Sequence, residues 1–318
     1  MSAIAEPAAV SVAIDAPPTS PPALSRRRFL KRALIGGLGA TAGAAAYARW
    51  WAPFQLEITQ HEMPLPNLGA DLCGKRLAHI TDLHVSDIVP LSYLRDSLAA
   101  CRARKPDILV FTGDYVTNAS RRYLADLDRL FEGVAAPLGV YASLGNHDYH
   151  EGCNHRFGCD GGNGEVAELI TELLTRRGVR VLRNGLAVVR VGAARLQFAG
   201  AEDLWSGYYD PDATFAGVDP SLPCIALSHN PDTIDELRDK PCHWILSGHT
   251  HGGQVSLPLI GPPILPVAHR ELASGLHRVN GRNIYVSRGV GYVRPVRFMC
   301  PPEISEFTLM RTAGARSR

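Results

Sequence analysis

The chain has 318 residues, 46% of them hydrophobic and 20% charged, and its formal net charge is +2. This length and composition fit one large or two small packed domains and exclude a chain that is disordered throughout. The excess of positive over negative charge lies in the first 48 residues, and the nearly neutral remainder argues against nucleic acid as a partner, because non-specific binding needs many cationic side chains.

The first 48 residues have the layout of an export signal. Residues 1–24 are rich in Ala, Pro and Ser without periodicity, and we expect them to be disordered. Residues 25–48 open with Ser25-Arg26-Arg27-Arg28-Phe29-Leu30-Lys31 and continue from Ala33 to Ala48 without a charge. The consecutive arginines resemble a twin-arginine (Tat) signal. This resemblance implies the Tat translocase as a partner and a location in the periplasm, or anchored in the membrane facing outside the cytoplasm.

Three interpretations of residues 25–48 remain open. Ala46-Tyr47-Ala48 is similar to a signal cleavage site, and cleavage there would release the rest of the chain. An uncleaved segment would stay as an anchor, although it is shorter than the ~20 residues that span a bilayer comfortably. A buried N-terminal helix with a basic cap fits the same pattern.

The seven cysteines contain no C-x-x-C pair, so the sequence shows no zinc or redox motif. Cys153 and Cys159 bracket a glycine-rich loop that extends to Gly164. They either form a local disulfide in an oxidising compartment or remain free thiols. The loop is either a flap over a site or an ordinary surface loop.

Residues 56–312 form the predicted main domain, in which short apolar runs alternate with helical patterns. Such alternation indicates βαβ units, whose ligands gather beyond the carboxyl ends of the strands. The predicted helices are 91–104, 120–133 and 165–177. The predicted strands are 56–63, which we expect at a sheet edge, and 77–81, 108–112, 140–144, 179–182, 187–191, 196–200, 225–228, 244–247, 284–287 and 304–309.

Five of these strands end in polar residues. In chain order the residues are Asp82 and His84, then Asp114, then Asn146, His147 and Asp148, then His229, and finally His249 and His251. Any one of them alone would more often be a capping or hydrogen-bonding residue. Together they exceed what one ion needs, which favours two divalent ions, and oxygen and imidazole ligands without cysteine suit Mn, Fe or Zn.

The ordered blocks D-x-H, G-D, G-N-H-[DE], H and G-H-x-H resemble the calcineurin-like metallophosphoesterases, complete from Asp82 to His251. The resemblance implies an α/β (α+β) fold, a four-layer double β-sandwich flanked by helices, with the site at the strand ends. It also implies ligand roles, with Asp114 bridging the two ions. One ion would take Asp82, His84 and His251, and the other Asn146, His229 and His249.

The same resemblance implies a metal-bridging hydroxide as the nucleophile that attacks phosphorus. His147 would stabilise the phosphoryl oxygens or protonate the leaving group. Asp148 would orient His147 or support a metal ligand. His79, His150, His155 and His243 lie outside the blocks, and we expect them to be structural or surface residues.

The chain also resembles a bacterial branch of exported phosphodiesterases, in stretches such as Leu227–Asp232 and Arg297–Ile304. That branch is linked to cell-envelope substrates, including nucleotide–lipid diphosphates. The second block reads Gly113-Asp114-Tyr115-Val116-Thr117-Asn118 and lacks the D-R-G of protein Ser/Thr phosphatases, which argues against that activity. We therefore expect hydrolysis of a phosphodiester or diphosphate of an envelope lipid or nucleotide. The alternatives are a phosphomonoesterase with the same metals and a non-catalytic metal-binding envelope protein.

Two further features bear on the substrate. Residues 254–267 are apolar and broken by prolines, and they are either a wall for an acyl chain, a lip that touches a membrane surface, or a hairpin packed on its own core. Arg288, Arg294 and Arg297 either bind a second phosphate or carboxylate of the substrate or form a solvated cluster.

Overall fold

The structure is a computed structural model that describes residues 25–149 and 164–312. The chain divides into two units, residues 1–44 and residues 45–318. The first unit holds most of helix α1 (Arg26–Ala46), and the three interpretations of residues 25–48 stay predictions. Among the described residues, none of the helices has both the length and the apolar character needed to cross a bilayer.

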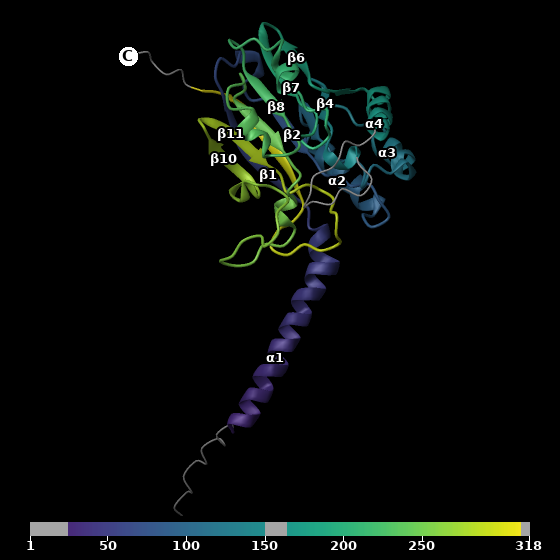
Figure 1. The fold of residues 1–318 in the computed structure, drawn as a ribbon, viewed down its shortest axis with the longest axis vertical. Coiled ribbons are helices and arrows are strands. Elements are labelled where there is room, and N and C mark those ends of the chain that lie inside the picture. Colours follow the sequence, from purple (N-terminus) through teal and green to yellow (C-terminus); the bar gives the residue numbers. More distant parts are fainter. Residues whose placement is uncertain (1–24, 150–163, 313–318) are drawn as a thin grey trace, which may run out of the picture. The chain divides into compact units, whose positions relative to one another are not determined.

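The second unit is built on two mixed six-stranded sheets (Figure 1). The first sheet has, in spatial order, β1 (Glu57–Leu65), β12 (Glu303–Arg311), β2 (Arg76–Ile80), β3 (Ile108–Thr112), β4 (Val140–Ser143) and β5 (Val179–Val181). The second has β10 (Gly275–Val279), β11 (Arg282–Val286), β9 (Trp244–Ser247), β8 (Cys224–Leu227), β7 (Ala194–Gly200) and β6 (Gly185–Val191).

Alternate residues of the strands fill different layers. Leu77 and Val110 of the first sheet share one buried cluster with Phe198 and Leu246 of the second, so this cluster fills the space between the sheets. Their neighbours face outward, because period-2 side chains point to opposite faces of a strand. Thus Phe111 joins the cluster under α2 (Leu91–Ala103), α3 (Leu124–Leu130) and α4 (Glu165–Arg176).

The outer face of the second sheet has its own cluster, in which Ala226 and Ile245 meet Phe215 of α5 (Pro211–Phe215) and Ile234 of α6 (Thr233–Glu236). The layers are therefore helices, sheet, sheet and helices. The predicted four-layer double β-sandwich is confirmed. Short helical turns cover Tyr47–Trp51, Ala52–Phe54, Ala70–Leu72, Arg121–Tyr123, Asn146–Asp148, His251–Gly253 and Arg270–Leu272.

All the predicted strands are present, and β3 and β9 have the predicted bounds. Strand β1 lies at a sheet edge as expected, paired only with β12 within the first sheet. The helix predicted at 120–133 is instead a 3-10 turn followed by the shorter α3, which ends at Leu130. Strand β10 was not predicted, because Gly275-Leu276-His277-Arg278-Val279 has neither an apolar run nor clear alternation.

The parallel pairs bring the relevant strand ends together. Strands β2, β3 and β4 run parallel in the first sheet, and β8 and β9 run parallel in the second. Carboxyl ends of parallel neighbours lie at one edge of a sheet. Each of these five strands is followed by one block of the polar residues identified in the sequence.

Candidate active site

The nine polar residues at the five strand ends are all buried. Asp82, His84, Asn146, Asp148 and His229 have no exposed surface, and the others are exposed by 5% or less. Burying so many polar side chains is costly unless each has a partner. Their arrangement shows which partners they have.

One cluster combines groups from both sheets. The Nε2 atoms of His84 and His251 lie 3.0 Å apart, and His251 Nε2 is 3.3 Å from Asp82 Oδ1. His84 Nε2 is also 3.4 Å from Asp114 Oδ2. Asp82, His84 and His251 form a group that could hold a metal ion, with ligand atoms within 4.8 Å of one another. These are the three residues expected to bind one ion.

Asp114 connects this cluster with a second one. Asp82, Asp114 and His229 form another potential metal group, and His229 Nε2 lies 3.2 Å from Asp114 Oδ2. His229 Nδ1 is 2.6 Å from the carbonyl oxygen of Thr112, to which it can only donate. That bond leaves Nε2 as the nitrogen with a lone pair, and it faces a carboxylate oxygen.

His249 shows the same pattern toward Asn146. Its Nε2 lies 3.3 Å from the carbonyl oxygen of Pro266, and in the tautomer that donates to this oxygen Nδ1 is left as an acceptor. Nδ1 is 2.8 Å from Asn146 Oδ1, which is also an acceptor. Facing acceptors are unfavourable without a positive charge between them, whereas metal ligands are arranged in this way with the second imidazole nitrogen held by a carbonyl. The residues therefore fit divalent metal ions.

Burial keeps three of the four candidate imidazole ligands neutral. Burial lowers the pKa of His84 to about 3 and the pKa values of His249 and His251 well below the usual value. Burial alone would also lower the pKa of His229, but the Asp114 carboxylate outweighs it and raises that pKa well above the usual value. Neutral imidazole is the form that binds metals.

The backbone that carries these side chains is strained. Five site residues have positive φ values, namely Asp82 (56°), His84 (48°), Asp114 (55°), His249 (69°) and His251 (50°). Non-glycine residues rarely adopt this conformation, and clusters of them mark functional sites.

Two glycines let the loops approach one another. A Cβ atom at Gly248 would lie 2.2 Å from Asp82 Oδ2, and one at Gly145 would lie 2.3 Å from Asp114 Oδ1. No side chain fits at such distances, so glycine is needed at Gly248 where loops of the two sheets meet, and at Gly145 where two loops of the first sheet meet.

The structure separates the roles of His147 and Asp148. His147 Nδ1 accepts the Asn118 N–H (3.2 Å), and its ring lies edge-on to His84 with centroids 4.9 Å apart. The Asp148 carboxylate accepts backbone N–H groups of Gly145 (2.8 Å), Tyr115 (2.9 Å) and Asp114 (3.0 Å). Of the two roles expected for Asp148, these bonds favour support of the Asp114 loop over orientation of His147.

Sequence reasoning missed the residues that hold the histidines in place. Asn118 Oδ1 lies 3.1 Å from His147 Nδ1, and Thr117 Oγ1 lies 3.2 Å from His84 Nδ1. Both follow Asp114 in the sequence, at the positions where the family's D-R-G variant differs. A comparison of this chain with the D-R-G motif, position by position, would have identified Thr117 and Asn118.

A second group of residues was also missed. The Trp205 ring meets His249 edge-on with centroids 4.6 Å apart, and Asp203 is fully buried, which raises its pKa to about 6. Asp203 and Trp205 come shortly after β7. Site residues are expected directly after predicted strands, and the same rule applied to this strand would have identified them.

The three arginines have different surroundings. Arg297 has no exposed surface, and its guanidinium donates to the carbonyl oxygens of Gly291 (2.6 Å), Arg288 (2.9 Å) and Cys300 (3.2 Å). Arg297 is therefore an interior residue held by backbone carbonyl oxygens. Arg288 pairs with Glu303 and Glu57, while Arg294 is exposed. A substrate-binding role for these two stays a prediction.

The histidines outside the blocks divide as follows. His79 is buried, with Nε2 2.8 Å from Thr112 Oγ1, and His243 Nδ1 accepts the Cys224 N–H at 3.1 Å, so both are structural. His150, His155 and the cysteines Cys153 and Cys159, whose pairing the sequence leaves open, lie outside the described residues. The same holds for most of the loop considered as a flap.

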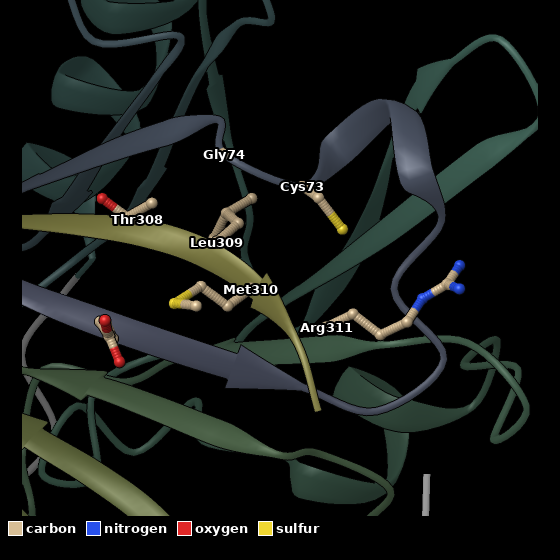
Figure 2. A pocket seen from close by; sticks show the side chains of 7 residues that line it. Cys73, Gly74, Thr308, Leu309, Met310 and Arg311 are labelled. Atoms are coloured by element: carbon tan, nitrogen blue, oxygen red, sulfur yellow. The ribbon is translucent and has the colours of Figure 1, made fainter. Parts of the chain in front are cut away.

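A surface pocket lies elsewhere on the molecule (Figure 2). It is lined by residues around the end of β12, namely Glu62, Cys73, Gly74, Thr308, Leu309, Met310 and Arg311. Because β12 runs antiparallel to β2, its last residues lie at the edge of the sheet opposite to Asp82. This pocket is not part of the histidine and aspartate site.

Comparisons with known proteins agree with the geometry. Residues 75–253 match the family described as Calcineurin-like phosphoesterase. The chain is 33% identical to the uncharacterized metallophosphoesterase YkuE of Bacillus subtilis, over 91% of this chain and 99% of that protein. It is also 33% identical to the phosphodiesterase YaeI of Escherichia coli, over 90% of this chain and 100% of that protein.

A third relative is named UDP-2,3-diacylglucosamine pyrophosphatase LpxG, from Chlamydia trachomatis, at 32% identity over 82% of this chain and 93% of that protein. Among solved structures, a dimetal phosphatase from Danio rerio matches with a TM-score of 0.42 and 12% identity, over 71% of this chain and 94% of that one, a likeness too weak to support an argument. The match over residues 75–253, the relatives at 33% identity and the buried histidine and aspartate site together show that the chain is a metallophosphoesterase of the calcineurin-like family.

Proposed function

We propose that the protein hydrolyses phosphodiester or diphosphate bonds of a cell-envelope lipid or nucleotide, with two divalent ions. The observation that carries the proposal is the pair of clusters that share Asp114, one with His84 and His251 and the other with His229. The names of the relatives YaeI, a phosphodiesterase, and LpxG, a pyrophosphatase of a diacylated nucleotide sugar, support the choice of bond.

The ligands of the two ions are assigned from the clusters. Asp82, His84 and His251 would hold one ion. Asn146, His229 and His249 would hold the other, with Asp114 between them. When bound, the ions would supply Lewis-acid stabilisation of the phosphoryl oxygens and an acidic water, and Mn, Fe and Zn all suit these ligands.

His147 is the chain's own candidate for proton transfer. His147 Nδ1 lies 3.2 Å from the Asn118 N–H and 3.1 Å from Asn118 Oδ1, and we take it to accept the N–H, so that the neutral ring carries its proton on Nε2. A ligand atom of His147 lies within 4.8 Å of those of His84 and Asp114, so the ring borders the site. From there Nε2–H can donate to a phosphoryl or leaving oxygen, a role that contributes roughly 10² to 10⁴-fold to rate.

The test compares diesters with monoesters. Metal-loaded protein is assayed on bis(p-nitrophenyl) phosphate and on p-nitrophenyl phosphate, after the metal content is measured. The proposal predicts a higher kcat/KM on the diester. A preference for the monoester would favour the phosphomonoesterase alternative, and no turnover of either by protein with two ions would favour the non-catalytic one.

We also propose that the chain is exported by the Tat route and keeps residues 25–48 as an anchor. Its support beyond the arginines is the position of Ala48, which is 7% exposed and whose carbonyl oxygen accepts the Arg297 N–H at 2.9 Å. Cleavage after Ala48 would leave this buried N–H without its partner, at a cost of about 1–3 kcal/mol. Mass spectrometry of protein from the membrane fraction tests this, because an N-terminus at Arg49 would contradict it.

A further inference from the structure

Residues 254–266 follow the metal-binding loop directly, and the tip of this segment is exposed. Leu259, Ile264 and Ile260 have relative exposures of 109%, 77% and 73%. The hairpin packed on its own core, one of the three interpretations of the sequence, is therefore wrong. Figure 1 shows a yellow-green loop projecting beyond the strands of the second sheet. Three large aliphatic side chains so exposed in one short loop are unusual for a surface that meets only water.

The base of the segment is held firmly against the site. A Cβ atom at Gly253 would lie 2.5 Å from the Pro262 Cβ atom, so the Gly253 backbone packs directly against the Pro262 ring. Pro266 offers its carbonyl oxygen to His249, and the Asp232 carboxylate accepts the N–H groups of Ala268 (2.7 Å) and His269 (3.0 Å). The exposed tip thus stands on a fixed support that includes a candidate metal ligand.

The tip itself has a defined turn. The N–H of Gly261 donates to the Leu257 carbonyl oxygen at 2.8 Å, and the N–H of Leu257 donates to the Gly261 carbonyl oxygen at 2.9 Å. Within this turn Leu259 has a φ of 66°, a conformation that glycine and asparagine adopt more readily than leucine. An aliphatic residue is thus held in an unfavourable conformation that points its side chain fully outward.

Two other segments with exposed apolar side chains are connected to the base of this segment, at Gln254 and Ser256. The side chain of Gln254 donates to the Val296 carbonyl oxygen at 2.7 Å, and the Ser256 N–H donates to the Phe298 carbonyl oxygen at 2.9 Å. The next residue, Met299, is 60% exposed. Tyr47 packs edge-on against Phe298, and shortly after it come Trp50 and Trp51, exposed by 68% and 61%. We call this set the lip: Trp50, Trp51, Leu259, Ile260, Ile264 and Met299.

Positively charged residues near the lip indicate which kind of surface it would bind. Arg49 and Arg294 are both exposed, the first next to Trp50 and the second bound through its backbone to Gln254. Exposed tryptophans with arginines beside aliphatic side chains are typical of surfaces that enter the headgroup region of a membrane. Positive side chains are also attracted to anionic lipids.

We propose that the lip inserts into the surface of an anionic lipid bilayer. Docking in this way would bring the turn that carries His249 and His251 to phosphoesters held in the same membrane. The docking itself does not depend on which bond is cleaved, and only the delivery of a lipid-bound substrate rests on the proposed function.

A tryptophan reporter tests insertion directly in the full chain. The Trp50→Phe/Trp51→Phe background receives either Leu259→Trp or Leu276→Trp, because Leu276 on the edge strand β10 is also exposed (51%) and lies outside the lip. Both are mixed with vesicles of phosphatidylglycerol and phosphatidylethanolamine carrying brominated acyl chains. We expect quenching and a blue shift for Leu259→Trp alone. Equal responses of the two variants would overturn the proposal.

Affinity provides the second measurement. Leu259→Ser/Ile260→Ser should weaken sedimentation with the same vesicles roughly tenfold or more, because two large apolar side chains are removed from the lipid, whereas Leu276→Ser should bind like the parent chain. Residual binding through residues 25–48 is the same in every variant and cancels in the comparison. Unchanged affinity of Leu259→Ser/Ile260→Ser for the vesicles would overturn bilayer docking. An unquenched reporter together with a protein cross-linked to the lip would also overturn it, in favour of a protein partner.

The soluble diester separates this inference from the proposed function. Leu259→Ser/Ile260→Ser should hydrolyse bis(p-nitrophenyl) phosphate at the parental rate, which also shows that it is folded, and should lose activity only on a vesicle-bound phosphodiester. A quenched reporter in a protein that cleaves no phosphoester would refute the proposed function and support the lip. Normal diesterase activity with an unquenched reporter would do the reverse.

Discussion

The two sheets contribute different chemistry to the same site. The ends of β2, β3 and β4 supply every carboxylate and amide oxygen among the candidate ligands, from Asp82, Asp114 and Asn146, whereas the ends of β8 and β9 supply only imidazoles. The first sheet therefore sets the negative charge of the site. The second completes the ligand geometry with histidines that burial keeps neutral, except at His229, whose pKa the carboxylates raise. Changes on the two sheets should have different consequences.

The largest effect is expected from Asp114→Asn on the first sheet. The change removes the charge shared by both clusters, so we expect loss of both ions and a fall in kcat/KM on the order of 10³-fold or more. Metal content measured by plasma mass spectrometry alongside diester kinetics tests this. A variant that kept two ions and full activity would show that Asp114 does not bridge them.

A smaller effect is expected from His251→Ala on the second sheet. Only the cluster with Asp82 and His84 loses a ligand, so one ion should remain and metal affinity at the other position should fall about 10²-fold. His243→Ala is the matched control, because His243 is a histidine of the same sheet region that holds only the backbone of Cys224. If the change removed both ions, the division of ligands between two positions would have to be abandoned.

A still smaller effect should come from Asn118→Ala, which acts on the first sheet without touching a ligand. The His147 ring would lose its side-chain neighbour at Nδ1, and kcat should fall roughly tenfold while metal content and KM stay unchanged. The pH profile of kcat should shift as well, since the environment of the imidazole changes. A change in metal content instead would assign Asn118 to the ligand shell.

The least effect on activity is expected at Glu303, which joins the sheets away from the ions. This β12 carboxylate accepts from Thr59 (2.6 Å) and Arg288 (3.0 Å) and also bonds Tyr285 of β11. Burial alone would raise the pKa of Glu303, but Arg288 and these hydroxyl groups hold it below the usual value. Its stabilisation is therefore complete above pH ~4.3 and is lost as the pH falls through the lower pKa of the folded state.

Glu303→Gln should accordingly make the free energy of unfolding depend less on pH in the acid range. It should also lower that free energy at pH 7, by about 3 kcal/mol if the buried pair of Glu303 and Arg288 is broken. Urea unfolding at several pH values measures both. An acid limb identical to that of the parent would mean that other carboxylates account for it.

The sequence predicted the site better than its surroundings, for physical reasons. Buried parallel strands are continuous apolar runs, and their ends are marked by the first polar residues, so Asp82, Asp114 and His249 were placed without structural information. Strand β10 lacks such a run and was missed. Its place depends on antiparallel pairing with β11, which a local pattern does not encode.

The sequence also could not predict the roles of residues whose function depends on contacts between loops. Arg297 and Arg294 look alike in the sequence, yet one is fully buried on carbonyl oxygens and the other is exposed. The choice among roles for Asp148 likewise needed the backbone N–H groups that converge on its carboxylate. The exposure of Leu259 followed only from the path of its turn.

The burial of Arg297 links the stability of the fold to the charge of the site. Burial lowers the pKa of this guanidinium, and Asp82 is among the groups whose charge favours its ionised form. Arg297 in turn holds the carbonyl oxygen of Gly289, at a position where a Cβ atom would lie 2.7 Å from the Asp82 Cβ atom. A substitution that neutralises Asp82 would thus weaken a structural cation as well as a ligand set. Reduced thermal stability in such a variant, even in chelator, would be the mark of this coupling.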